Sequence, residues 1–149
     1  MIRTDTEHQK ALEQLERDAE TIEAQREHLQ SIGLVGEQLD RAMQPMASFH
    51  EQLKDEVETY ERMKRGDLGT LSSLTSIGRW LIGARIARGM TQKELADRLE
   101  VSESQVSRDE RNEYHGITVD RAQRTMDALG IRFRAEAENP LLEEFSPEF

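Results

Sequence analysis

The chain has 149 residues, of which 34% are charged and 36% hydrophobic, with a net charge of −10 and no cysteine. This length allows one ordinary domain, or a small domain with an appendage. The lack of cysteine excludes disulfides, cysteine-ligated zinc and a cysteine nucleophile. No stretch approaches the ~18 uninterrupted apolar residues of a membrane span, so we expect a soluble, cytoplasmic protein. The many helix-forming residues predict a mainly α fold.

The charge is unevenly distributed along the chain. Residues 1–65 carry 9 Lys/Arg against 15 Asp/Glu, and residues 135–149 carry none against 5. Residues 77–134 carry 11 against 9, which makes this segment net positive. The location of charge, more than its sum, decides whether a protein can bind nucleic acid. The middle segment can therefore approach phosphate groups that the rest of the chain repels.

Residues 1–64 form a helical region in which apolar residues recur at heptad spacing. The spacing runs over residues 8–33, is broken at residues 31–36, and restarts over residues 39–60. Such a pattern indicates two helices with narrow apolar seams. Pro45 either kinks the second helix or marks its beginning. The region is predicted to serve dimerisation or partner binding, as an antiparallel helical hairpin or as a coiled coil between two chains.

Residues 65–76 are rich in Gly, Ser and Thr and are interpreted as a linker with at most one short helix. Residues 77–130 contain several start and stop signals for short helices. Gly89 and Gly130 end helices, and Thr91, Ser102 and Thr118 are N-cap residues. The predicted helices are Ile77–Arg88, Gln92–Leu99, Glu103–Arg111 and Val119–Leu129.

The last segment, residues 131–149, combines a strand pattern with an acidic tail. Residues 131–138 alternate, with Ile131, Phe133, Ala135 and Ala137 on one side. A lone strand cannot satisfy its backbone hydrogen bonds. We therefore expect this strand to pair with its copy across a homodimer.

The segment Thr91–Asn112 has the parts of a helix-turn-helix. Leu95 and Ala96 lie on an inner face of the first helix, Val101 lies in the turn, and Val106 packs the second helix inward. Helical geometry then turns the opposite stripe of the second helix outward, where it can enter the major groove of double-stranded DNA.

The exposed stripe and its flanks carry residue types suited to reading DNA. Arg108 can contact guanine, Glu103 can accept a hydrogen bond from cytosine, and Gln105 can read adenine. Amide and basic groups nearby can contact phosphate. The predicted base-reading residues are Ser102, Glu103, Ser104, Gln105, Ser107 and Arg108. The predicted phosphate-contacting residues are Arg85, Arg88, Gln92, Lys93, Arg111 and Asn112.

These residues together resemble the Cro/repressor-type, or Xre, helix-turn-helix family over residues 77–130. The resemblance implies a four-to-five-helix DNA-binding domain in which Gln92 contacts phosphate and Ser102 to Ser104, Ser107 and Arg108 face the groove. It is carried by Ile77-Gly78, Leu81, Arg85, Arg88-Gly89-Met90, Thr91 to Ala96, Val101-Ser102, Val106 to Arg108 and Glu110-Arg111.

Two positions depart from the pattern of that family. Glu100 stands where a turn glycine is usual, and Asp109 stands where an apolar residue is usual. A buried carboxylate without a partner is costly. Either Arg132 or another base therefore pairs with Asp109, or the second helix is slightly rotated, which affects the predicted roles of Gln105 and Ser107.

The sequence therefore predicts a sequence-specific transcriptional repressor that binds an inverted repeat as a dimer and regulates its own gene. The architecture also resembles HigA-like antitoxins and regulators paired with a toxin or an ImmA/IrrE-type protease. The alternative is a protein–protein adaptor or toxin-neutralising protein whose DNA binding is secondary. No catalytic motif, cofactor fingerprint or metal-ligand spacing occurs, so an enzyme is not expected.

Overall fold

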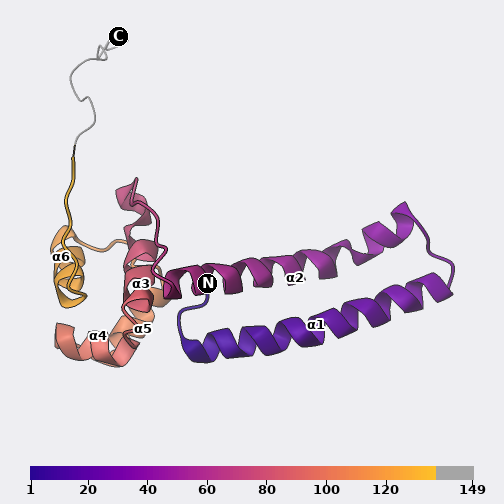
Figure 1. Cartoon of the computed structure of the whole chain (residues 1–149), viewed down its shortest axis with the longest axis horizontal. Coiled ribbons are helices and arrows are strands. Elements are labelled where there is room, and N and C mark those ends of the chain that lie inside the picture. The colour runs from indigo at the N-terminus through magenta and orange to yellow at the C-terminus, as the bar shows by residue number, and fades with distance from the viewer. Residues whose placement is uncertain (137–149) are drawn as a thin grey trace, which may run out of the picture.

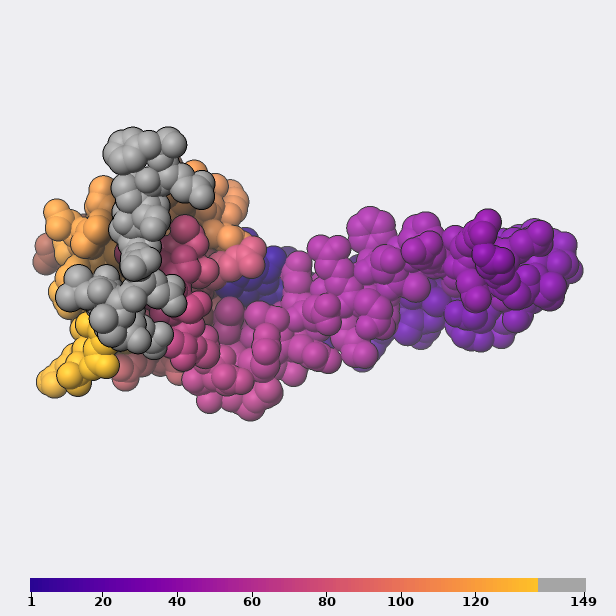
Figure 2. Space-filling view, turned by 90° about the horizontal axis from the view of Figure 1, so that it is seen from above, coloured from indigo at the N-terminus to yellow at the C-terminus, as the bar shows by residue number. Residues whose placement is uncertain are grey.

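The computed structural model describes residues 1–136, and every regular element in this part is a helix (Figure 1). A long hairpin of two helices extends from a compact bundle formed by the others (Figures 1 and 2). None of these helices combines the length and the hydropathy that crossing a membrane requires. The elements are α1 (Asp5–Ser31), α2 (Glu37–Lys64), the short 3₁₀ helix η1 (Leu74–Ser76), α3 (Ile77–Ala87), α4 (Gln92–Leu99), α5 (Glu103–Arg111) and α6 (Val119–Ala128).

The hairpin begins with a capped helix and turns at glycines. The hydroxyl of Thr4 accepts a hydrogen bond from the Glu7 backbone N–H at 3.1 Å, which satisfies one free donor at the start of α1. Gly33 has φ 98°, a left-handed conformation that glycine adopts without steric strain. The second helix passes through Pro45 and begins at Glu37, so Pro45 does not mark its start. Helices of 27 and 28 residues make the hairpin about 40 Å long.

The heptad seam holds the two long helices against each other in one chain. Leu39, Met43 and Val57 of α2 are buried along this seam, and on α1 the buried residue is Ala11, one position before the predicted seam residue Leu12. Other seam residues, such as Ile22, are only half-buried because two helices cannot enclose a seam from all sides. The single chain thus forms the antiparallel hairpin.

The hairpin and the bundle share one hydrophobic core. Ile2 before α1 and Tyr60 near the end of α2 belong to the same buried cluster as Leu81 and Ile82 of α3. The predicted linker packs on the bundle as well, since Leu68 lies 3.0 Å from the position that a Cβ on Gly83 would occupy. The segment 65–76 therefore does not separate two independent cores.

The four predicted helices of the bundle are present, and their boundaries agree to within one residue. The side chains of Thr91, Ser102 and Thr118 each accept a hydrogen bond from a backbone N–H three residues later, as their N-cap assignment predicted. These short helices have little stability of their own, so their caps and their shared core specify where they begin and pack.

A close backbone approach connects α3 to the turn after α5. A Cβ on Gly78 would lie 1.8 Å from the Glu113 carbonyl oxygen, so only glycine fits there. Glu113 and Tyr114 have φ 50° and 53°, which turns the chain sharply beneath α3. Tyr114 is buried and belongs to the hydrophobic core cluster.

The predicted strand is not formed within the described residues. Residues 131–136 have no regular secondary structure, and the rest of the predicted strand and the acidic tail lie outside the described part. A strand requires a hydrogen-bonding partner, and residues 1–136 supply no strand for these residues to pair with. The expected pairing with a second copy stays a prediction.

Candidate nucleic-acid interface

Backbone contacts define where α4 begins and how the chain turns from α4 to α5. Thr91 and Glu94 form a reciprocal capping box at the start of α4. Glu100 ends α4 in the left-handed conformation, with φ 57° and ψ 40°. The next residue, Val101, returns its N–H to the carbonyl of Ala96 at 3.0 Å. Glu100 therefore adopts the conformation for which glycine is the usual residue, and nothing in the structure explains why a glutamate stands there.

The capping box also affects the acidity of Glu94. Hydrogen bonds from the backbone N–H and the hydroxyl of Thr91 lower the pKa of the Glu94 carboxyl. The carboxylate is thus ionised at neutral pH and lies at the N-terminal end of α4, where the helix dipole favours negative charge.

The inward faces of α4 and α5 fix which side of α5 reaches solvent. Leu95, Ala96 and Val106 are each 1% exposed, and the small Ala96 allows close packing between the helices. The outward-facing residues Ser104, Arg108 and Arg111 are exposed. The stripe predicted to enter the major groove is therefore largely free.

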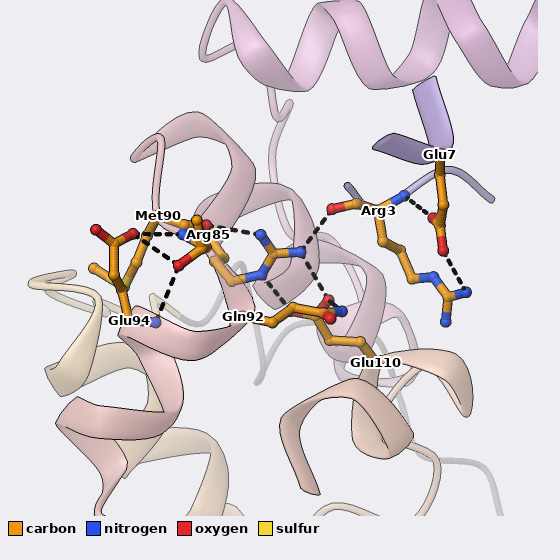
Figure 3. A network of polar contacts seen from close by, with 8 residues as sticks. Arg3, Glu7, Arg85, Met90, Gln92, Glu94 and Glu110 are labelled. Atoms are coloured by element: carbon orange, nitrogen blue, oxygen red, sulfur yellow. Dashed lines mark hydrogen bonds and ion pairs between the residues drawn. The ribbon is translucent and has the colours of Figure 1, made fainter. Parts of the chain in front are cut away.

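A buried ion pair anchors α5 to α3 directly behind this stripe (Figure 3). The side chains of Arg85 and Glu110 are 4% and 0% exposed, and both carboxylate oxygens of Glu110 accept hydrogen bonds from the Arg85 guanidinium. Another guanidinium N–H reaches the Met90 carbonyl oxygen at 2.8 Å. Gln92, at the start of α4, donates from Nε2 to Glu110 Oε2 at 2.7 Å. One charge pair thus joins three helices.

The predicted phosphate contact by Arg85 is therefore wrong. Its guanidinium is buried, and its donors are directed to Glu110, Met90 and the N-terminal segment, so it cannot extend to DNA. The amide of Gln92 is likewise directed inward in the free protein. Its position as the first residue of α4 still places its backbone N–H at a helix end suited to phosphate.

The N-terminal segment completes the buried network from the hairpin side. Arg85 Nη2 donates to the carbonyl oxygen of Arg3 at 2.8 Å, across 82 positions of sequence. The neighbouring Ile2 is 6% exposed within the shared core. The base of the hairpin is consequently attached to the residues that orient α5.

The other predicted phosphate-contacting residues lie on the surface. Lys93 is exposed and forms an i,i+4 ion pair with Asp97. Arg88 donates to the carbonyl oxygen of Gly130 at 2.9 Å, and Arg111 and Asn112 are exposed at the end of α5. Within residues 1–136, none of these four side chains has a buried partner that would prevent a phosphate contact.

The predicted base-reading residues divide into two groups. Glu103, Ser104 and Arg108 are exposed on α5. Ser102 is exposed, but its hydroxyl caps the helix by accepting from the Gln105 N–H at 3.2 Å. Gln105 and Ser107 are half-buried at the margins of the stripe.

The partner of Asp109 is Arg121 of α6, whose Nη2 lies 2.7 Å from Asp109 Oδ2. The named candidate Arg132 was therefore wrong, although the expectation of a basic partner is confirmed. Sequence reasoning also missed the pairing of Glu110 with Arg85. A signal was present, because each charge lies four residues after an inward-facing apolar residue, Leu81 or Val106, and thus on a buried stripe.

Residues 81–135 match the family described as helix-turn-helix. The matched segment is similar to helix-turn-helix domains. No curated protein and no solved structure matches the chain. The helix-turn-helix match supports a DNA-binding regulator as the general class. It begins within α3, covers α4 to α6 and leaves out the hairpin.

Proposed function

We propose that the chain is a sequence-specific repressor of transcription that inserts α5 into the major groove of double-stranded DNA. The observation that carries this proposal is the orientation of α5. Val106 and Glu110 are 1% exposed on its inner side, whereas Ser104, Arg108 and Arg111 are exposed on the opposite side. A rigidly held helix with a polar, basic outer stripe is what base-edge recognition requires.

Each exposed group has a specific role in this proposal. Arg108 forms a bidentate contact with guanine O6 and N7, and Glu103 accepts a hydrogen bond from a cytosine amino group. Lys93, Arg88, Arg111 and the first backbone N–H groups of α4 contact phosphate and fix the register on the duplex.

The repressor acts as a homodimer on an inverted repeat, with half-site centres about 34 Å apart. One domain with a net charge of +2 over residues 77–134 binds DNA weakly, and a second copy supplies the missing affinity. Two regions suit the dimer contact: the half-buried seam of the hairpin and the apolar alternation that starts at Ile131. In the antitoxin-like form of this proposal the repressor controls its own gene, and its hairpin binds a toxin or a protease.

The test is fluorescence anisotropy of the full chain on the DNA upstream of its own gene and on a scrambled duplex, at two salt concentrations. Preference for the upstream DNA, two chains per site and a steep loss of affinity with salt support the proposal. Arg108→Ala weakens specific binding by about 1–3 kcal/mol and relaxes base preference, whereas Lys93→Ala weakens binding to all sequences alike. Equal loss for both variants on both duplexes would refute the roles assigned to them.

The second candidate function is a protein–protein adaptor, and the exposed apolar groups of the hairpin favour it. Ile32 and Val35 at the hairpin turn are 61% and 69% exposed, and Phe49 on α2 is 73% exposed. Residues 1–65 are also net acidic, which disfavours contact between the hairpin and DNA. A chain that binds no duplex in the anisotropy experiment would favour this function over the repressor.

A further inference from the structure

Asp109, one of the two residues at which this chain departs from the pattern of the family that it resembles, lies at the centre of a polar relay. Its side chain is 18% exposed, and Oδ2 accepts from Arg121 Nη2 of α6 at 2.7 Å. Its other oxygen, Oδ1, accepts from the side-chain Nε2 of Gln105, one turn earlier on α5, at 2.9 Å. Asp109 is thus joined both to α6 and to the margin of the outer stripe.

The relay continues from Gln105 to the predicted guanine reader. Gln105 Oε1 accepts from Arg108 Nη2 at 3.0 Å. An ionised carboxylate can only accept hydrogen bonds, so the amide nitrogen of Gln105 must face Asp109. Its carbonyl oxygen must then face Arg108. The charge of Asp109 therefore determines which way the Gln105 amide points, and the amide determines where the Arg108 guanidinium rests.

We propose that Asp109 is a specificity-determining positioning residue, which acts through Gln105 to hold Arg108 in the orientation that reads guanine. Gln105 then serves as the bridge in this relay and not as an independent adenine reader. This proposal rests on the proposed function, because it concerns how well the chain discriminates between DNA sequences.

A structural role for Asp109 makes a different prediction. In that case the ion pair with Arg121 matters because it connects α5 to α6, and the link to Gln105 is incidental. Arg121 is 52% exposed, and an exposed ion pair contributes little to stability. If Asp109 positions Arg108, base preference depends on the hydrogen bond between Asp109 and Gln105. If Asp109 only connects the helices, base preference depends on the ion pair between Asp109 and Arg121.

The expected loss of guanine preference follows from the conformational freedom that the Arg108 side chain regains when the relay is removed. Ordering one long side chain in a complex lowers affinity about 2- to 10-fold, so a side chain that is already held avoids this loss. Removing the relay should therefore reduce the preference for guanine at the Arg108 position by about 2- to 10-fold. The affinity for non-specific DNA should change much less, because phosphate contacts dominate it.

The experiment compares full-length variants by binding-site selection and then by anisotropy on the selected duplex and its guanine-substituted forms. Asp109→Leu removes the relay, and the neighbouring cavity of about 60 Å³, which is lined by Leu99, Val101 and Val106, can accept the larger apolar side chain. The matched control is Asp127→Leu. Asp127 accepts a hydrogen bond from Gln123 four residues earlier, at 2.8 Å, but lies on α6 and is not connected to Arg108.

A second pair of variants separates the two halves of the relay. Gln105→Leu breaks the bridge and leaves the ion pair between Asp109 and Arg121. Arg121→Met removes the ion pair and leaves the bridge. We expect Gln105→Leu to lose guanine preference to the same extent as Asp109→Leu, and Arg121→Met to keep it. Thermal unfolding of each variant shows whether it is folded.

The outcomes are distinguishable. Lost guanine preference in Asp109→Leu and Gln105→Leu, together with retained preference in Asp127→Leu and Arg121→Met, supports the proposal. A wild type that selects a guanine-containing site, and an Asp109→Leu variant that selects it equally well, overturns the role of Asp109 and leaves the proposed function standing. A wild type with no sequence preference overturns the proposed function, and the role of Asp109 in specificity with it.

Discussion

The buried pair of Arg85 and Glu110 provides the sharpest prediction about stability. Arg85→Met removes a guanidinium that donates to both Glu110 oxygens and to the Met90 and Arg3 carbonyl oxygens. Glu110, whose side chain is fully buried, then has Gln92 as its remaining side-chain donor. Breaking a buried ion pair by removing one partner typically costs about 3–5 kcal/mol, because the other charge stays buried without compensation. We expect a loss of that size.

The assay is urea unfolding of the full chain at neutral pH, followed by the fluorescence of Trp80, the one tryptophan in the sequence. The control is the double variant Arg85→Met with Glu110→Leu, which buries no charge. It should recover most of the lost free energy of unfolding, since apolar replacements of buried pairs are often neutral or stabilising. A loss below about 1 kcal/mol in the single variant, or a double variant no more stable than the single one, would refute the reasoning.

The same double variant tests the corrected role of Arg85 in DNA binding. If Arg85 contacts no phosphate, the slope of log affinity against log salt should equal that of the wild type. A slope reduced by about one unit would indicate a lost phosphate contact and would contradict the buried position of Arg85.

Three further predictions concern backbone geometry and pH. Glu100→Gly should raise the free energy of unfolding by about 0.5–1 kcal/mol, because it relieves the left-handed strain at φ 57°. Gly78→Ala should lower it by at least about 2 kcal/mol, since the added Cβ would lie 1.8 Å from the Glu113 carbonyl oxygen; urea midpoints measure both. Burial raises the pKa of Tyr114 above its usual 10.0, so the unfolded chain ionises first and stability falls as pH rises above 10. Unfolding measured from pH 9 to 11 should show a flatter decline for Tyr114→Phe, and an identical decline would contradict this assignment.

The local sequence determined much of the fold. Cap residues such as Thr91 and Ser102, stop signals such as Gly89, and helix-period apolar residues act through neighbours within one or two turns. Their effect can therefore be predicted without knowing the tertiary structure. The predictions of short helices, of the inner face around Leu95 and Val106, and of the helix-turn-helix itself depended on such local rules, and these were confirmed.

The tertiary structure decided how charged residues are used. Arg85 lies 25 positions from Glu110 and 82 from Arg3. The local pattern places Arg85 and Glu110 each on a buried stripe, but it does not indicate which groups meet. The fold brings Arg121, near the start of α6, and not Arg132, to the carboxylate of Asp109. A charged side chain in a sequence can contact DNA, water or a buried partner, and burial determines which. The sequence therefore specified at which residues the helices begin and end, whereas the packing of the helices determined which arginines remain free to bind DNA.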